Sequence, residues 1–346
     1  MNNRVLKEEL FFSMTWDYLN VFLPAQHRDS PKTATSYEDG LTIFRRYITD
    51  VRAIPMDQFR FEDLTYDFLL DYRVFLVEKG YKASTVNHRL AVITAYMKYA
   101  ATKKTDLCQI YMNISEVPYV TAPSRIREII EDKDSIRELL AAPGPSKKGI
   151  RDQVILVVLY DTAIRADELI GLNLSDVNIS ADEPYLRICG KGDKERIVAL
   201  SEKAIPLIRQ YISIYHKDLR KRTEPFIYTV IKGMTGRMSE RNVERIVQKY
   251  ADIVRKKGIT IPDKVYPHML RRTRASGWYR DEVPIETIAV ILGHSDTKTT
   301  RKSYVSPSVE MLRKQMSSGT DAEPDAFEKK PLWKNDSELA RLCGIR

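Results

Sequence analysis

The sequence predicts a mainly α-helical protein with a small β-hairpin, an α+β fold made of two domains. At 346 residues the chain is long enough for two domains of ordinary size. Apolar residues recur at helical spacing through most of it, and two short segments near residue 190 alternate like strands. We expect a helical domain at 1–118, a linker at 119–126, a second domain at 127–315 and a tail segment at 316–346.

The first domain begins with a clear helix signal. Ser30 and Pro31 combine an N-cap residue with a proline in the first turn, and Tyr37, Leu41 and Phe44 follow at helical spacing. A second helix is expected at 66–79, ending at Gly80. A third is expected to begin with Ser84 as its N-cap and to bury one apolar face, formed by Val86, Leu90, Ile93 and Met97.

The opposite face of this third helix carries Asn87, His88 and Arg89. Such a face is commonly just solvated. Because the same residue types also contact phosphates and groove edges, the alternative is a surface that binds nucleic acid. Both interpretations stay open at this point.

The segment at 117–125, which includes most of the linker, contains two prolines, Pro118 and Pro123, and little periodicity. Beyond it, helices are expected at about 132–140 and across the apolar run at 154–160. Alternating segments at 185–189 and 196–200 flank the turn Gly190-Lys191-Gly192-Asp193-Lys194, which predicts a hairpin with lysine at its tip. Further helices are expected at 202–216, 239–256 and 284–292, with a short strand at 226–230.

Composition favours a polyanionic partner. Lys and Arg number 56 against 47 Asp and Glu, a formal net charge of +9, which raises the expectation of nucleic-acid binding without establishing it. The three cysteines have no CxxC spacing, so neither a disulfide framework nor a zinc site is expected. A polar stretch at 1–9 and the lack of long apolar runs suggest no signal peptide, no membrane span and a cytosolic setting.

The residues that best indicate a chemical function lie between 268 and 304. His268 and Arg271 are three apart and can share one helical face. His294 follows a helix-ending Leu-Gly, and Tyr304 lies just beyond. This set lacks the serine, cysteine or carboxylate pair of common hydrolases, but its positive charge, imidazole and phenol suit attack on a phosphodiester by tyrosine.

Each residue also has an ordinary structural explanation. Arg165 could form a surface salt bridge with Asp167 or Glu168. Lys191 could be a solvated turn residue, and His268 and Arg271 could be capping or core groups. His294 could interact with the end of the preceding helix, and Tyr304 could be a packed aromatic. The order of the residues along the chain favours a shared role.

Together the motifs resemble the tyrosine recombinase family of lambda integrase and Xer proteins, over about residues 127–310. They are, in order, Thr162-Ala-Ile-Arg165-Ala-Asp-Glu-Leu169, Gly190-Lys191-Gly-Asp-Lys-Glu-Arg-Ile-Val198, Pro267-His268-Met-Leu-Arg271-Arg-Thr273, Leu292-Gly-His294-Ser and Tyr304. Two features depart from the pattern. Ala163 stands where the family usually has glycine, and the interval from His294 to Tyr304 is one residue longer than in many Xer-type members.

The resemblance implies the roles of the site residues. Arg165 and Arg271 would neutralise the phosphate through forked hydrogen bonds, helped by His268 and His294. Lys191 would protonate the departing 5′ oxygen while Tyr304 forms a 3′-phosphotyrosine. DNA contacts are expected from Asn87, His88, Arg89, Lys194 and Arg272. No cofactor and no metal are implied.

The resemblance also implies an assembly and a biological role. The two domains would form a C-shaped clamp on double-stranded DNA, and a homotetramer would exchange strands through a Holliday junction. The apolar tail at 332–345 could dock on its own domain or on a neighbouring protomer, and the resemblance favours the neighbouring protomer. We expect an integrase or transposase of a mobile element. An Xer-like dimer resolvase is the alternative, and a type IB topoisomerase or a non-catalytic DNA-binding regulator is less favoured.

Overall fold

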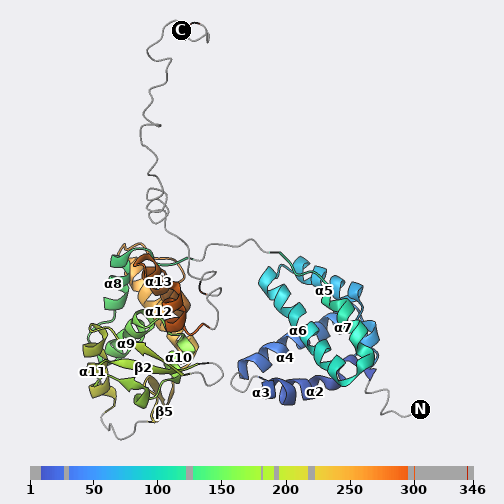
Figure 1. Ribbon diagram of the computed structural model, residues 1–346, viewed down its shortest axis with the longest axis horizontal. Helices are drawn as coiled ribbons and strands as arrows, with labels where there is room; N and C mark the ends of the chain where they lie inside the picture. Colours follow the sequence, from blue (N-terminus) through green and yellow to red (C-terminus); the bar gives the residue numbers. More distant parts are fainter. Residues whose placement is uncertain are drawn as a thin grey trace. The chain divides into compact units, whose positions relative to one another are not determined.

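The computed structural model describes residues 9–26, 31–121, 128–180, 182–190, 195–216 and 223–294, together with Thr300 and Arg341. It contains two compact units, an N-terminal one within residues 1–125 and a C-terminal one lying mostly within residues 126–346 (Figure 1). The predicted mainly helical α+β class is confirmed. In the part of the chain that is described, no helix is long and apolar enough to span a membrane.

The N-terminal unit is entirely helical where it is described, apart from an isolated bridge between Leu10 and Arg60. Its elements are η1 (Phe11–Met14), α2 (Thr15–Asp17), η2 (Tyr18–Phe22), α3 (Leu23–Gln26), α4 (Pro31–Arg46), η3 (Tyr47–Val51), η4 (Phe61–Asp63), α5 (Tyr66–Glu78), α6 (Ala83–Lys103), η5 (Thr105–Leu107) and α7 (Cys108–Ser115).

The three predicted helices of this unit are present as α4, α5 and α6. The side chain of Thr65 caps α5 by accepting a hydrogen bond from the backbone of Phe68 at 3.1 Å. The expectation that Ser84 caps α6 is wrong. The helix begins one residue earlier, at Ala83, and its N-cap is Lys82, so Ser84 lies inside the first turn.

Aromatic rings form the core of this unit. Phe11 makes edge contacts with Phe44, Phe59 and Tyr96 at centroid distances of 5.5, 5.6 and 5.2 Å. The buried Tyr96 hydroxyl donates to the Phe11 carbonyl at 2.6 Å and accepts from the Met14 backbone at 3.3 Å. The polar atom of this buried ring is therefore satisfied by local backbone.

The C-terminal unit combines helices with two small sheets. Its elements are α8 (Lys133–Ala141), α9 (Lys147–Asp161), α10 (Ala166–Gly171), η6 (Leu174–Asp176), β1 (Val177–Asn178), β2 (Tyr185–Cys189), β3 (Glu195–Ala199), α11 (Ala204–Tyr215), β4 (Tyr228–Ile231), β5 (Met234–Arg237), α12 (Glu240–Lys256), α13 (Pro267–Arg280) and α14 (Ile285–Leu292).

The larger sheet has the order β1-β2-β3, so the predicted strands on either side of Lys191 are confirmed. A second pair, β4 and β5, is antiparallel, with Tyr228 opposite Arg237 and Ile231 opposite Met234. The sequence did not predict β5. All four of its residues are exposed, and they have no apolar alternation that would signal a strand.

The packing of this unit brings the functional segments together. Helix α9 packs against α11 and α13, and α12 contacts α8, α9, α10 and α13. Helix α14 lies against both α13 and β3. An aliphatic core that includes Val154, Leu159 and Leu186 supports these contacts. The ends of α9, α13 and α14 and the inner face of β3 consequently surround one small region.

Candidate active site

The turn between α9 and α10 places Arg165. The Thr162 hydroxyl donates back to the Val158 carbonyl at 2.6 Å and closes α9. Ala163 then takes a left-handed conformation with φ 51°, which L-residues adopt at a cost of about 1–2 kcal/mol. Arg165 is the N-cap of α10, and its backbone N–H donates to the Glu168 carboxylate at 2.8 Å. The positive φ gives a physical reason for the glycine that the family usually has here.

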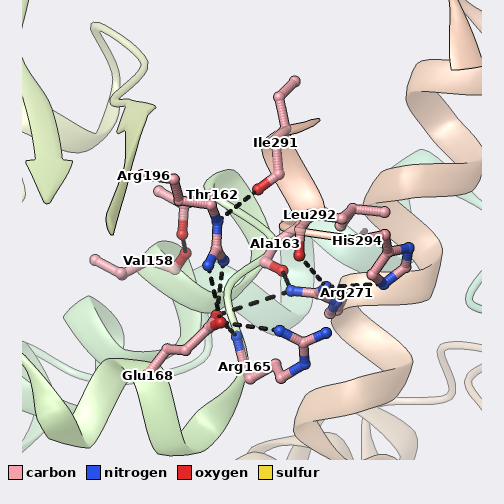
Figure 2. Close-up of polar contacts among 10 residues, drawn as sticks. All are labelled: Val158, Thr162, Ala163, Arg165, Glu168, Arg196, Arg271, Ile291, Leu292 and His294. Carbon is pink, nitrogen blue, oxygen red and sulfur yellow. Dashed lines mark hydrogen bonds and ion pairs between the residues drawn. The ribbon is translucent and has the colours of Figure 1, made fainter. Parts of the chain in front are cut away.

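Arg271, on α13, is fully buried. Its Nη1 donates to the Ala163 carbonyl at 2.7 Å and its Nη2 donates to the Leu292 carbonyl, also at 2.7 Å (Figure 2). One guanidinium thus joins the turn after α9 to the end of α14. Both of these acceptors are uncharged backbone carbonyls, which do not neutralise its positive charge.

Glu168 is the shared anion of the site, with its side chain 5% exposed. Arg165 Nη1 donates to Oε1 at 2.9 Å, and Arg196, on β3, donates to Oε1 at 3.0 Å and to Oε2 at 2.9 Å. Arg271 Nη1 lies 3.9 Å from Oε2. Three guanidinium groups and one carboxylate leave an excess of two positive charges (Figure 2).

The protonation state of Glu168 follows from these contacts. Burial alone would raise the pKa of the carboxyl, but the hydrogen bonds and charges of Arg196 and Arg165 outweigh it and hold the pKa below its ordinary value. The group is therefore an anion at neutral pH.

His294 follows Gly293, the C-cap residue of α14, which is left-handed with φ 64°. Its Nε2 lies 3.3 Å from Nη2 of Arg271, and its Nδ1 lies 2.8 Å from the hydroxyl of the buried Thr300. Because an arginine can only donate, Nε2 is the acceptor and Nδ1 carries the proton. Burial, followed by the charges of Arg271 and Arg165, lowers the pKa of His294 to about 4. The imidazole is neutral at pH 7.

His268 lies in the first turn of α13, three residues before Arg271, and is exposed. Its charge also contributes to the lowered pKa of His294, which places it in the same electrostatic cluster. The structure therefore gathers four of the predicted catalytic residues, His268, Arg271, His294 and Arg165. Lys191 and Tyr304, and with them Lys194, lie outside the described residues, so their roles stay predictions.

The predicted DNA-binding residues of the N-terminal unit make local contacts. Asn87 bridges the Val120 backbone, donating to its carbonyl at 3.0 Å and accepting from its N–H at 2.7 Å. His88 Nε2 is 2.8 Å from the Ser36 hydroxyl, and the Arg89 guanidinium stacks on Tyr81 at 3.9 Å. His88 is exposed, whereas Asn87 and Arg89 are partly buried.

Arg272, the remaining candidate for DNA contact, is 3% exposed. Its Nη2 donates to the Tyr266 hydroxyl, and its guanidinium lies 5.4 Å from the centre of that ring. A DNA contact by Arg272 would require this side chain to leave its buried position. Its role stays a prediction.

Sequence reasoning missed two members of the site, Arg196 and Thr300, and treated Glu168 only as a possible surface partner of Arg165. A signal for Arg196 exists in the strand pattern. Residues 196, 198 and 200 share one side of the strand, and Val198 and Leu200 are buried. An arginine on that inner side requires a buried partner, which is Glu168. Among the described residues, no cluster of His, Cys, Asp or Glu could hold a metal ion.

Comparison with family models gives two matches. Residues 131–311 match the phage integrase family, and residues 13–111 match the phage integrase SAM-like domain. The two matched ranges include most of the N-terminal unit and the site residues Arg165, Glu168, Arg196, Arg271 and His294.

Comparison with individual proteins gives matches over most of the chain. The tyrosine recombinase XerC of Staphylococcus haemolyticus is 27% identical over 301 residues, covering 86% of this chain and 93% of that protein. XerC of Thermodesulfovibrio yellowstonii is 31% identical over 229 residues, 64% of this chain and 71% of that protein.

Solved structures match the fold. XerH recombinase bound to a palindromic difH substrate, a post-cleavage complex, has a TM-score of 0.65 at 18% identity, over 84% of this chain and 80% of that one. The Tn1549 transposon integrase in complex with a circular intermediate DNA has a TM-score of 0.63 at 14% identity, over 90% of this chain and 99% of that one.

Proposed function

Because the chain belongs to the phage integrase family of tyrosine recombinases, which cleave and rejoin DNA, we propose that it does so through a 3′-phosphotyrosine formed on Tyr304. The observation that carries the proposal is the convergence of Arg165, Arg271 and His294 around one buried carboxylate, with two positive charges in excess. A phosphodiester carries one negative charge, and a second develops as the new bond forms.

Arg165 and Arg271 are proposed to bind the non-bridging oxygens. Arg165 is 39% exposed, and among the described residues its guanidinium donates to Glu168 through Nη1 alone, so it can turn the rest of its fork toward an incoming phosphate. Arg271 is held by two backbone carbonyls and contributes a fixed positive potential. Charge placed in advance where it develops in the transition state is usually the largest catalytic contribution.

The two histidines are proposed to move or share protons. His294 is neutral, with the Nε2 lone pair turned toward Arg271, so it can take up a proton and then donate to a phosphate oxygen. A bound phosphate raises the pKa of a nearby imidazole and favours that change. His268, exposed at the start of α13, is proposed to accept the phenol proton as Tyr304 attacks phosphorus.

The remaining step is departure of the 5′ oxygen. As the bond from Tyr304 to phosphorus forms, the bond from phosphorus to O5′ breaks, and Lys191 is proposed to supply the proton that makes a 5′-hydroxyl. Rejoining reverses the step with an incoming 5′-hydroxyl. Because the phosphoester bond is exchanged rather than hydrolysed, no nucleotide cofactor is required.

The test is covalent capture of DNA. The wild-type protein should form a protein–DNA adduct on a nicked substrate from which the cleaved 5′ fragment diffuses away, and Tyr304→Phe should form none. Tyr279→Phe, which also removes one phenol hydroxyl from this unit, is the matched control and should keep the wild-type yield. An adduct that persists in Tyr304→Phe would disprove the nucleophile assignment.

For the biological role, we propose the integrase or transposase of a mobile element. The likeness to the Tn1549 transposon integrase over 99% of that chain supports this. The Xer relatives favour a second candidate, a resolvase of chromosome or plasmid dimers. Sequencing the DNA captured on Tyr304 in cells separates the two. Ends of an element and circular junctions support the first, and one chromosomal site that does not move supports the second.

We further propose that four protomers assemble on DNA and that the apolar tail at 332–345 contacts a neighbouring protomer. The tail's apolar residues are too few to form a core of their own, and a short helix is marginal alone. Truncation before Ala322 should leave binding to a single site unchanged and weaken the pairing of two sites in a gel-shift assay. Unchanged pairing by the truncated protein would contradict this role.

A further inference from the structure

Arg196 uses its whole guanidinium group inside the protein. It lies on β3 with its side chain 13% exposed. Nη1 and Nη2 form a fork onto the two oxygens of Glu168, at 3.0 and 2.9 Å, and Nε donates to the Ile291 carbonyl at 3.1 Å. A lysine could not reproduce this pattern, because it offers one compact charge in place of a planar fork.

The end of α14 is thereby held from two sides. The last carbonyls of a helix have no partner within it. Here the Ile291 carbonyl accepts from Arg196 and the next one, of Leu292, accepts from Arg271 at 2.7 Å. His294 follows two residues later, with Nε2 beside Arg271. Its position therefore depends on both arginines.

Gly293 shows how closely Arg196 approaches this helix end. A Cβ added to Gly293 would lie 2.8 Å from Nη1, 3.0 Å from Cζ and 3.1 Å from Nε of Arg196. The guanidinium cannot move aside freely, since three hydrogen bonds hold it. The glycine of the Leu-Gly-His motif is thus required both for its left-handed backbone and for the space that Arg196 occupies.

Arg196 also limits how strongly Glu168 pairs with the other two arginines. Arg196 binds both oxygens of this carboxylate, and forked arginine–carboxylate pairs are among the strongest hydrogen-bonded ion pairs. Without Arg196, the buried carboxylate would turn to Arg165 and Arg271, whose Nη1 atoms already lie 2.9 and 3.9 Å away. Those guanidinium groups would then be drawn away from a phosphate.

We propose that Arg196 is a positioning residue for the cleavage reaction. It holds Glu168 and the end of α14 in place, so that Arg165 and Arg271 keep their guanidinium groups for the scissile phosphate and His294 stays beside Arg271. The inference rests on the proposed function for the identity of the phosphate-binding groups. Arg196 acts through these residues and is assigned no contact with the reacting atoms.

The test compares single-turnover adduct formation on the nicked substrate among variants of the full-length protein. Arg196→Met should slow the reaction about 10–100-fold, by analogy with the loss found when a residue that orients a metal ligand is removed. Affinity for the duplex in a gel-shift assay should stay unchanged. Arg187→Met is the matched control, since Arg187 lies on the neighbouring strand β2 in an exposed pair with Asp176, and its rate should equal the wild type.

A second substitution distinguishes positioning from general support of the fold. In the double variant Glu168→Gln/Arg196→Met, the carboxylate that would compete for Arg165 and Arg271 is gone. This variant should react about fivefold faster than Arg196→Met or more, a gain that corresponds to the coupling of ~1 kcal/mol typical of residues in one ion-pair network. A residue that only stabilised the fold would give no such recovery.

Each outcome has a defined meaning. A wild-type rate in Arg196→Met, or a double variant no faster than it, overturns the inference. If Arg196→Met does not fold, Arg196→Lys takes its place, and it should be comparably slow because it keeps the charge and loses the fork. A wild-type rate in the lysine variant also overturns the inference. If the wild-type protein itself forms no adduct, it is the proposed function that fails.

Discussion

The two units of this protein differ in the side chains that they bury. The N-terminal unit packs uncharged aromatic rings around Phe11, and the hydroxyl of Tyr96 is satisfied by nearby backbone. The C-terminal unit has an aliphatic core and, beside it, a cluster of buried ions around Glu168. An aromatic core gains stability without creating charge. A buried ion cluster is costly to form, and it persists here where a phosphate is proposed to bind.

The predicted functional residues converge on one site in the C-terminal unit and do not converge in the N-terminal unit. In the C-terminal unit, residues more than one hundred positions apart, Ala163 and Arg271, meet within 2.7 Å. In the N-terminal unit, Asn87, His88 and Arg89 contact residues of their own unit, and the structure does not draw them to a common point. Substitutions in the aromatic core of the N-terminal unit should therefore alter stability alone, whereas substitutions in the charged cluster of the C-terminal unit should alter the chemistry as well.

The largest effect is expected for Arg271→Met. Loss of its charge should slow adduct formation at least ~100-fold, and its two buried carbonyl partners would be left unpaired, lowering the free energy of unfolding by ~3 kcal/mol. Arg165→Met should slow the reaction comparably and destabilise less, because Arg165 is 39% exposed. Single-turnover rates and denaturant titrations measure both effects. Equal destabilisation by the two variants would contradict the difference in burial.

In the N-terminal unit, Tyr96→Phe should affect stability alone. The change leaves the buried Phe11 carbonyl without its 2.6 Å donor and should lower the free energy of unfolding by ~1–2 kcal/mol. The rate of adduct formation at saturating protein should not change. A slowed reaction with unchanged stability would show that the separation between the two units is wrong.

Ala163→Gly tests the left-handed turn. Glycine relieves the strain at φ 51°, but it loses a buried methyl group and adds flexibility to the unfolded chain, so the net change in the free energy of unfolding should be below ~1 kcal/mol. Ala275→Gly is the matched control, because its methyl group is buried in the same cluster on helix α13 and glycine brings no relief there. It should cost ~2 kcal/mol by denaturant titration. Equal costs would rule out strain at Ala163.

A pH dependence of stability is also expected from His294. Its pKa is about 4 in the folded protein and near the ordinary value of 6.5 in the unfolded chain, so the unfolded chain binds more protons between these values. Stability should therefore fall as the pH drops from 6.5 toward 4, with no contribution from this group above 6.5. His294→Asn should lose this part of the dependence in melting curves at pH 7.5 and 5. Parallel curves for the two proteins would contradict the lowered pKa.

Much of the fold was predictable because its elements carry local signals. Proline and N-cap residues mark helix starts, and alternation with a glycine-containing turn marks the hairpin strands. Helix α13 is harder to interpret, since Arg271, Arg272 and Thr273 are buried alongside Met269 and Leu270 and leave no amphipathic stripe. The buried position of Arg272 could not be inferred from such a pattern.

The candidate site was predictable as a set of residues and not as a network. The order of motifs indicated Arg165, His268, Arg271 and His294. The contacts of Arg196 with Glu168 and Ile291 join residues that are 28 and 95 positions apart, and only tertiary packing reveals them. Thr300 could not be predicted for the same reason, because a hydroxyl that accepts a hydrogen bond from His294 has no sequence pattern of its own.

The hydrogen bond between His294 and Thr300 has a consequence for the reach of the proposed nucleophile. Ten residues of chain separate Tyr304 from His294, a length that could span at most roughly 35 Å. While Thr300 is hydrogen-bonded to the imidazole, only the four residues from Thr300 to Tyr304 set this reach, which falls to roughly 14 Å. While this hydrogen bond is made, the proposed attack by Tyr304 is restricted to phosphates close to His294 of the same protomer.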